Sequence, residues 1–316
     1  MDYPIWVWIA FNIFILALLA FDLGVFHREA KEISFREAIW TTGFYISIAL
    51  LFDALVYYFE GPHKGIEFLT AYFLEYALSM DNIMVFVVVL AHFQVPPQYQ
   101  MRVLIWGILG ALVLRGIFIF AGIALISAFG GVVILLGAFL IYTGVRTLRG
   151  GNTASELEDS WIIRTSDRVF PVSPHYDGPK FFTRSNGGGL SVTPLFIVLI
   201  VLNVIDILFA VDSIPAVFAI TRDPFIVYTS NVFAVLGLRS LYFALSGMLD
   251  KFRYLKVGLS LVLIFIGLKM IYNYPPEWPD IPTEWALIVT AVLIFGSILA
   301  SLVRNYFDKS SDVIQS

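Results

Sequence analysis

Long apolar stretches, separated by short polar segments, run through the whole chain. Nine of them are close to or above the roughly 18–20 residues that a helix needs to cross a bilayer. They cover residues 5–26, 38–59, 67–92, 102–122, 131–148, 193–219, 225–247, 256–273 and 284–303. The runs are continuous and lack the alternation of a membrane β-barrel strand. The pattern therefore predicts an all-α, polytopic membrane protein with about nine transmembrane helices.

The segments between these runs contain residues that end helices. Pro96-Pro97 and Pro224 mark two turns, and several prolines precede the last span. Residues 149–191 form the one sizeable polar segment and predict a loop with little core of its own. Asp2 precedes the first run where a signal peptide would carry basic residues, and no small-residue cleavage site follows. We therefore expect the first run to be a retained span.

Composition supports a membrane protein and narrows its chemistry. Hydrophobic residues make up 59% of the chain and charged residues 14%, against about 45–50% and 25% in soluble domains. The chain has no cysteine, which excludes disulfides, thiolate metal sites and thiol nucleophiles. Its four histidines have no metal-ligand spacing, and a net charge of −4 argues against a nucleic-acid partner. We expect no cofactor, and the sequence predicts no stable protein partner.

Basic residues are distributed unevenly between the two sides of the predicted bundle. Of the 20 lysines and arginines, 15 fall in segments on one side, including the 149–191 loop and the C-terminal tail. Cytoplasmic loops are enriched in such residues. The N-terminus is therefore predicted outside, with the 149–191 loop and the C-terminus in the cytoplasm.

Two segments within the apolar runs resemble each other. Glu75 and Asp81 are six residues apart, as are Asp206 and Asp212, and a short polar residue follows the second acid in each. The resemblance continues into the two spans that follow each pair, where 110–115 echoes 236–239 and aligns Arg115 with Arg239, and where 142–146 echoes 265–269 and aligns Gly144 with Gly267. Because three spans is an odd number, the two units would be inverted across the membrane, as in many secondary transporters. The predicted division is 1–66 (two spans), 67–148 (first repeat), 149–191 (loop), 192–274 (second repeat) and 275–316 (last span and tail).

These four acids lie where charge is unfavourable. A carboxylate at the bilayer centre costs about 2.5–3.5 kcal/mol even on lenient scales, so each must pair, protonate, face water or bind a cation. Pairing with Arg115 and Arg239 is the structural alternative. Six residues turn an ideal helix by about 240° and raise it by about 9 Å. The two acids of a pair therefore either serve successive positions on a path or flank an unwound segment, for which Pro215 offers a reason.

Neutral oxygen donors accompany the acids. A site of carboxylates, amides and hydroxyls, without thiolate or clustered imidazole, favours magnesium, calcium or manganese. The candidate metal ligands are Asp81, Asp212, Glu75, Asp206, Asn82, Ser213 and Asn203.

At these residues the sequence resembles the TerC family, and within it the Alx-like branch. The resemblance covers all nine spans. It is carried by Glu75 with Asp81-Asn82, by the run from Asp206 to Ala216, and by the stretch from Thr221 to Arg239. It implies a manganese exporter of the bacterial inner membrane, linked to metal, pH and tellurite-resistance phenotypes, with these acids as the metal site. Asn203 departs from the pattern, since an acid is expected there, and the site loses one charge.

The combined prediction is a secondary transporter, not an enzyme, that exports Mn²⁺ in exchange for protons across the lipid bilayer. One alternative is a transporter of calcium or another cation. An intramembrane aspartyl protease also uses two buried acids, but the Gly-x-Gly-Asp motif of that class is missing. A membrane scaffold acting through the 149–191 loop would leave the buried acids unexplained.

Overall fold

The computed structural model describes residues 3–25, 34–149, 176–184, 190–245, 252–275 and 277–315. Nine long helices form most of this described part. They are α1 (Ile5–Val25), α2 (Phe35–Glu60), α3 (Pro62–His92), α4 (Pro97–Ala128), α5 (Val132–Leu148), α8 (Pro194–Phe218), α9 (Pro224–Leu245), α10 (Leu255–Tyr272) and α11 (Thr283–Gln315). Each predicted span coincides with one helix, with ends that differ by up to six residues, apart from α11, which continues to Gln315.

The fold is an all-α polytopic membrane protein, as predicted. Eight of the described helices are long and apolar enough to cross a membrane, and α5, with 17 residues, is a shorter apolar helix. Four helices start on a proline: α3, α4, α8 and α9. Proline suits the first helical turn because its fixed φ is already helical and its missing N–H needs no partner there.

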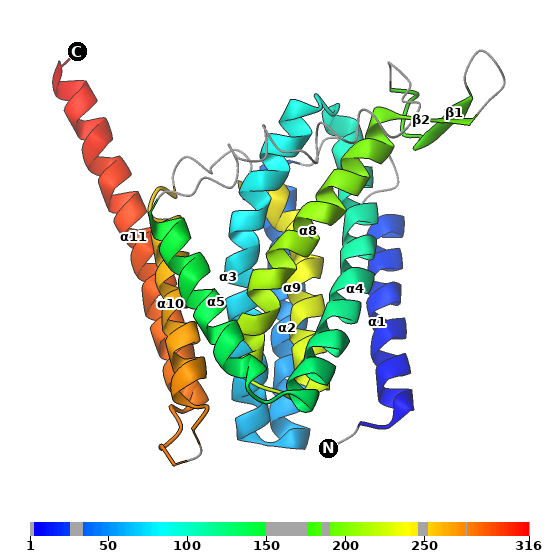
Figure 1. Cartoon of the computed structure of the whole chain (residues 1–316). Helices are drawn as coiled ribbons and strands as arrows, with labels where there is room; N and C mark the ends of the chain where they lie inside the picture. The colour runs from blue at the N-terminus through cyan, green and yellow to red at the C-terminus, as the bar shows by residue number, and fades with distance from the viewer. Residues whose placement is uncertain are drawn as a thin grey trace.

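The helices run alternately up and down (Figure 1). The N-terminus of the described chain lies at one end of the bundle and the C-terminus at the other. α3 and α8, which carry the two acidic pairs, run in opposite directions. The three-helix units α3–α5 and α8–α10 are therefore oppositely oriented, in the way the inverted-repeat prediction requires.

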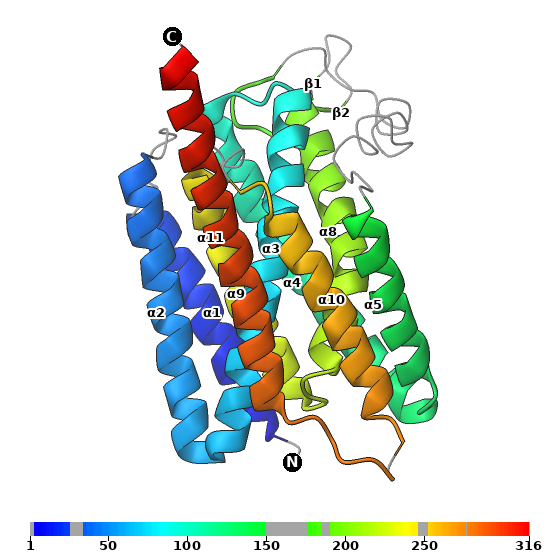
Figure 2. The same ribbon diagram turned by 90° about the vertical axis from the view of Figure 1, so that its left-hand side faces the viewer.

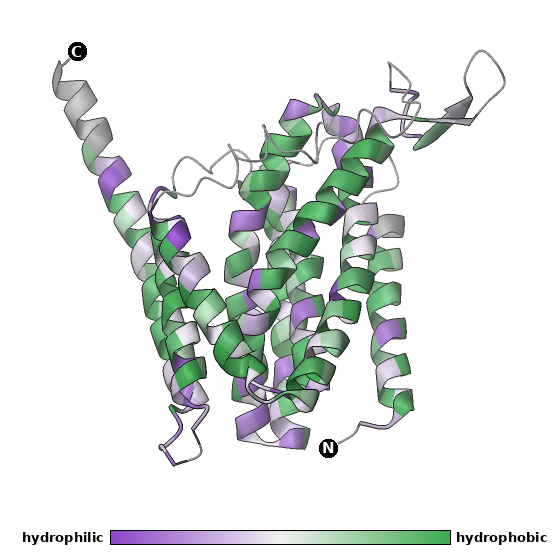
Figure 3. Ribbon diagram, in the orientation of Figure 1, coloured by the Kyte–Doolittle hydropathy of each residue, from purple (hydrophilic) through white to green (hydrophobic). Residues whose placement is uncertain are grey.

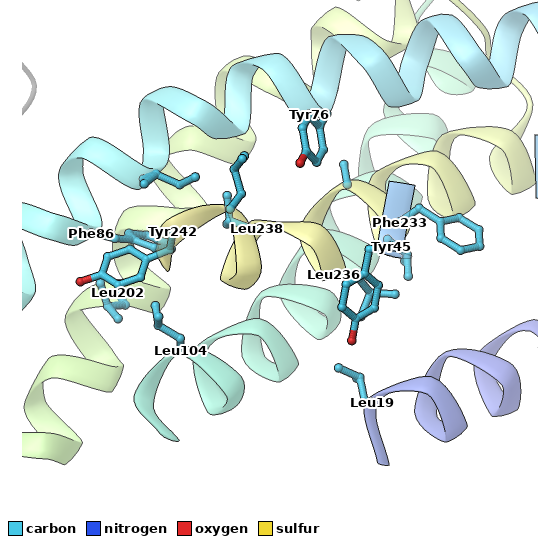
Figure 4. Close-up of a cluster of buried hydrophobic side chains, with 14 of the residues drawn as sticks. Leu19, Tyr45, Tyr76, Phe86, Leu104, Leu202, Phe233, Leu236, Leu238 and Tyr242 are labelled. Carbon is cyan, nitrogen blue, oxygen red and sulfur yellow. The ribbon is translucent and has the colours of Figure 1, made fainter. Parts of the chain in front are cut away.

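Helix α9 is the centre of the bundle. In its most apolar window 94% of the residues are buried, whereas the value for α1 and α2 is 22%. Side chains from five other helices surround it (Figure 4). Those labelled there are Leu19, Tyr45, Tyr76, Phe86, Leu104 and Leu202, around Phe233, Leu236, Leu238 and Tyr242 of α9 itself.

The outer helices expose large apolar side chains. Trp40, Leu135 and Val292 are each about two-thirds exposed or more, and hydrophobic residues predominate along the helices (Figure 3). Such a surface is unfavourable in water but suits a bilayer, where apolar side chains face lipid.

Helices α5 and α10 cross each other closely at glycines, and both views show them side by side (Figures 1 and 2). A carbon added at Gly144 would lie 2.7 Å from the carbonyl oxygen of Ser260. A carbon added at Gly267 would lie 2.6 Å from the carbonyl oxygen of Gly137. Small residues allow backbones to approach this closely, which is a common means of helix association in lipid.

These two contacts mirror each other. Gly144 and Gly267, which the predicted repeat aligns, are 123 residues apart, and so are the two residues whose carbonyls they approach. Their second neighbours, Ile264 and Ile141, are also 123 residues apart and lie at 2.8 and 2.9 Å. Reciprocal contacts of this kind are what a two-fold axis in the membrane plane produces between inverted repeats.

A short hairpin projects from one end of the bundle, next to the start of α8 (Figure 1). β1 (Phe182–Arg184) pairs antiparallel with β2 (Leu190–Val192). Before it, the hydroxyl of Tyr176 donates to the carbonyl of Phe93 at the end of α3, at 2.6 Å. The rest of the predicted 149–191 loop lies outside the described residues, so its lack of a core stays a prediction.

Leucine at Gly144 or Gly267 is expected to destabilise the protein, because the new side chain would meet backbone that cannot rotate away. Overpacking typically costs about 1–3 kcal/mol. Thermal unfolding of the purified protein, followed by fluorescence-detected size exclusion, should show a lower midpoint for both variants. Gly296→Leu is the matched control, since nothing lies within 4 Å of a carbon added there. Equal midpoints for all three variants would contradict this account of the crossing.

Candidate cation site

Three charged side chains from three helices meet in the interior. Glu75 of α3, Arg115 of α4 and Asp206 of α8 are 0%, 1% and 2% exposed. Each lies well inside its helix, far from both ends. Charges at such depth are rare in membrane proteins and mark pathways or functional sites.

Arg115 bridges the two acids. Its Nε donates to Asp206 Oδ2 at 3.0 Å and its Nη2 to Asp206 Oδ1 at 2.9 Å. Its Nη1 donates to Glu75 Oε1, and also to Asn231 Oδ1 of α9 at 3.3 Å. The two-bonded contact to Asp206 matches the planar fork of a guanidinium to the planar carboxylate. A single cation therefore joins an acid of one three-helix unit to an acid of the other.

Several polar atoms around this bridge have no partner among the described residues. Ser213 Oγ donates to Glu75 Oε1 at 3.2 Å, but Glu75 Oε2 is buried without a hydrogen bond. The buried Ser79 Oγ, one turn from Glu75 along α3, and the buried Asn231 Nδ2 are also without partners. Buried polar groups are normally satisfied, so this site has unused hydrogen-bonding and ligand capacity.

Asn203 lies on α8, one turn before Asp206, where α4 packs closely on α8. A carbon added at Gly110 would lie 2.1 Å from Asn203 Oδ1. The amide of Asn203 donates to the carbonyl of Leu199 at 2.8 Å, while its Oδ1 is buried without a partner. A side chain at Gly110 would therefore have to displace this amide from its present position.

The other two predicted acids lie apart from the bridge. Asp81 and Asp212 are half-buried, and neither makes a hydrogen bond or ion pair within the described part of the chain. Each is attracted by a more distant cation: Lys256 of α10 for Asp81 and Arg146 of α5 for Asp212.

Both helices that carry the acids are unbroken. α3 is helical throughout, and α8 continues through Pro215 to Phe218. The alternative of an unwound segment between the paired acids is therefore wrong for this structure. Pro215 has no N–H, so the carbonyl of Val211 lacks its helical hydrogen bond. The helix nevertheless continues through this position.

Antiparallel helices put the four acids in an order across the membrane. Along α3, Asp81 lies about 9 Å from Glu75 toward the end of the bundle that carries the C-terminus. Along α8, which runs the other way, Asp212 lies about 9 Å from Asp206 toward the opposite end. The bridged pair is thus central, with one acid on either side of it.

The structure brings together only part of the predicted ligand set. Glu75, Asp206 and Ser213 share the bridge, while Asn82 is buried at 3% exposure on the Asp81 side and Asn203 packs against Gly110. No group of three or more acids and histidines arranged to hold a metal occurs among the described residues. Sequence reasoning did not assign Asn231 to the site, although its position in a buried, polar stretch of α9 was a usable signal.

The second buried arginine has a different partner. Arg239 of α9 donates through Nη2 to Asp22 of α1, and both residues are nearly fully buried. Arg239 and Arg115 are aligned by the predicted repeat, so two equivalent arginines hold different acids. The sequence favoured ion pairs for both arginines, but it did not identify Asp22, a residue outside the repeat.

A cavity of about 610 Å³ opens at the end of the bundle where α3 begins and α8 ends. Lys269, 3% exposed, donates to the carbonyl of Ala219 at 3.0 Å in its wall. The charged residues that line the cavity are His63, Glu67, Arg222, Lys269, Asp280 and Glu284. Along α3 and α8, the buried apolar residues Ala71, Leu74, Ile214 and Val217 separate it from the bridged acids.

Residues 60–312 match the family described as integral membrane protein TerC family. The chain belongs to the TerC family. The predicted resemblance is thereby confirmed, and the transmembrane fold agrees with it.

Curated relatives cover nearly the whole TerC chain. An uncharacterised membrane protein of Myxococcus xanthus is 47% identical over 306 residues, which span 97% of this chain and 95% of the relative. A protein of Photorhabdus laumondii named putative membrane-bound redox modulator Alx is 41% identical, over 95% of this chain and 96% of its own. One of the same name from Salmonella typhi is 38% identical, over 95% and 93%. No solved structure matches this chain at a significant level.

Arg239→Gln is expected to lower the stability of this TerC protein strongly, because it removes the cation that compensates the buried Asp22. Breaking a buried ion pair at one end typically costs about 3–5 kcal/mol. The double variant Asp22→Asn/Arg239→Gln should recover most of the loss, since neither residue is then charged. Thermal midpoints in detergent measure both effects. A double variant as unstable as the single one would show that the pair is not what stabilises α1 against α9.

Proposed function

We propose that this TerC protein is a secondary transporter that exports a divalent cation, Mn²⁺, in exchange for protons. The observation that carries the proposal is the buried pair Glu75 and Asp206, held face to face across two antiparallel helices of opposite units. Transporters built from inverted repeats bind their substrate near the midplane, at the repeat interface.

The order of the acids supports a transport path with successive ion-binding positions. Asp81 would receive the ion on one side, the Glu75–Asp206 pair would hold it at the centre, and Asp212 would pass it toward the 610 Å³ cavity. Apolar residues between the pair and the cavity close the path in this conformation. Rocking of the two units against each other, with the α5–α10 crossing as the fixed contact, would open it.

The ligand chemistry favours a hard or borderline divalent ion. Carboxylates, the amide of Asn231 and the hydroxyls of Ser79 and Ser213 are oxygen donors of the kind that Mg²⁺, Ca²⁺ and Mn²⁺ take. The choice of manganese rests on the family resemblance, and calcium or another cation is the alternative. Asn203, in place of an expected acid, reduces the negative charge of the site and would weaken its hold on the ion.

Proton exchange follows from the excess of negative charge. Four carboxylates along one path exceed the charge of one divalent ion, so some of them would carry protons when the ion is absent. Protons and metal would then compete for the same oxygens, and a proton gradient would drive export.

The name of the Alx relatives mentions redox modulation. This chain has no cysteine, so it cannot act by thiol–disulfide exchange. Any effect of this protein on redox balance would then be indirect, for example through the supply of a redox-active metal such as manganese.

The distribution of basic residues supports an orientation in the bacterial inner membrane. On the side of the hairpin and the C-terminus lie Arg36, Arg102, Arg146, Arg149, Lys180, Arg253, Lys256 and Arg304. On the opposite side lie Lys64, Arg222 and Lys269. By the positive-inside rule, the first side is cytoplasmic and the N-terminus and the 610 Å³ cavity face outward.

Transport can be measured in inside-out membrane vesicles of a strain that lacks its own manganese exporters. An imposed proton gradient should drive Mn²⁺ uptake into vesicles that contain this protein. Asp206→Asn and Asp212→Asn, which keep shape but remove charge, should each lower the rate about tenfold or more, equivalent to about 1.4 kcal/mol of lost stabilisation. Asp177→Asn, on the exposed segment before β1, is the matched control.

Folded Asp206→Asn and Asp212→Asn proteins that still transport at the normal rate would refute the roles assigned to these residues. Absence of Mn²⁺, Ca²⁺ and Mg²⁺ transport by the unmodified protein would refute the function itself.

A further inference from the structure

We propose that Arg115 is a built-in counter-cation that occupies the Glu75–Asp206 pair when no metal is bound, and that the divalent ion must displace it. The inference rests on the proposed function, because it concerns the same two acids. It adds a residue that competes with the substrate and is exchanged for it during each cycle. In this view the guanidinium of Arg115 lies where the ion would bind.

The charges at the site are unequal. Two carboxyl groups, Glu75 and Asp206, share the single positive charge of Arg115. An ion pair that only stabilises helix packing needs one acid for one arginine, as in the pair Arg239–Asp22. A divalent ion would neutralise both carboxylates, so exchange of Arg115 for such an ion would remove the imbalance.

The bridge also leaves ligands unused. The second oxygen of Glu75 and the hydroxyl of Ser79 are buried without partners. Nη1 of Arg115 takes only one oxygen of Glu75, and a metal ion can be ligated by both oxygens of one carboxylate. The pocket therefore has more oxygen donors than the guanidinium employs, which suits an ion with a higher coordination number.

The bonds of Arg115 join the two units. The residue belongs to α4 of the first unit, and its two-bonded partner Asp206 belongs to α8 of the second. Displacement by a metal ion would break this connection between α4 and α8. Occupancy of the site would thereby change the contact between the units, which is the coupling that alternating access requires.

The competition predicts a definite order of affinities. If the guanidinium occupies the two acids for most of the time, only a small fraction of the protein can bind metal. The apparent dissociation constant for metal is then the intrinsic constant divided by that fraction. Arg115→Lys keeps the charge but loses the planar fork that spans both acids, so it should bind Mn²⁺ more tightly than the unmodified protein. Arg115→Gln should bind it more tightly still.

The experiment measures Mn²⁺ binding to the purified proteins in detergent by isothermal titration calorimetry, with Arg239→Lys as the matched control. The dissociation constant should fall severalfold in Arg115→Lys and about tenfold or more in Arg115→Gln, and it should stay unchanged in Arg239→Lys. In vesicles, both Arg115 variants should show a lower KM and also a lower maximal rate, because the internal cation that expels the ion competes less well in Arg115→Lys and is missing in Arg115→Gln.

Arg115→Lys decides between competition and simple repulsion. A fixed positive charge that merely repels the metal would give this variant the normal affinity, and that result, or weaker binding, would overturn the proposal. If Arg115→Gln does not fold, Arg115→Lys alone is sufficient for the test. Unmodified protein that transports Mn²⁺, combined with unchanged affinity in Arg115→Lys, rejects the competition only. Unmodified protein that neither binds nor transports Mn²⁺, Ca²⁺ or Mg²⁺ rejects the proposed function and this inference together.

Discussion

The compensation of buried charge in an apolar bundle is the constraint on which this structure depends. Two carboxylates and a guanidinium lie nearly fully buried among helices whose outer faces are suited to lipid. Removing such groups from water is costly unless they find partners of opposite charge. The geometry of Arg115, which reaches an acid in each unit, satisfies this requirement only in part. The remaining negative charge is what makes the site suitable for an exchangeable cation and not only for a fixed ion pair.

The positions of the acids follow from how the helices are arranged. Glu75 and Asp206 can face each other because α3 and α8 run in opposite directions through the centre of the bundle. The mirrored glycine contacts between α5 and α10 fix the outer ends of the two units against each other. In lipid, helices are held together by van der Waals contacts and not by the exclusion of water. Small residues bring the two backbones close and increase these contacts, so the crossing resists separation. The arrangement thus combines a tight contact at the periphery with a bridge at the centre that a metal ion could release.

Much of the fold could be predicted from the sequence, because continuous apolar runs and prolines directly determine where helices start and cross a bilayer. The nine spans and the opposite orientation of the two units agree with the structure. The acids could also be selected as a group, since charge in an apolar run is conspicuous. The sequence could not show that Arg115 takes both Glu75 and Asp206 while Arg239 takes Asp22. Those choices depend on helix rotation and on α1, which lies outside the repeat. Of the two alternatives for the paired acids, the unwound segment near Pro215 is absent from the structure, because a proline within a packed helix can be accommodated without unwinding it.

The most direct test of this account is a crystal structure of the protein soaked with Mn²⁺, with anomalous diffraction data collected at the manganese edge. The account predicts an anomalous peak between the carboxylates of Glu75 and Asp206, with the guanidinium of Arg115 moved away from both. A structure at saturating Mn²⁺ in which Arg115 still bridges the two acids, and in which the anomalous peak lies elsewhere, would contradict it.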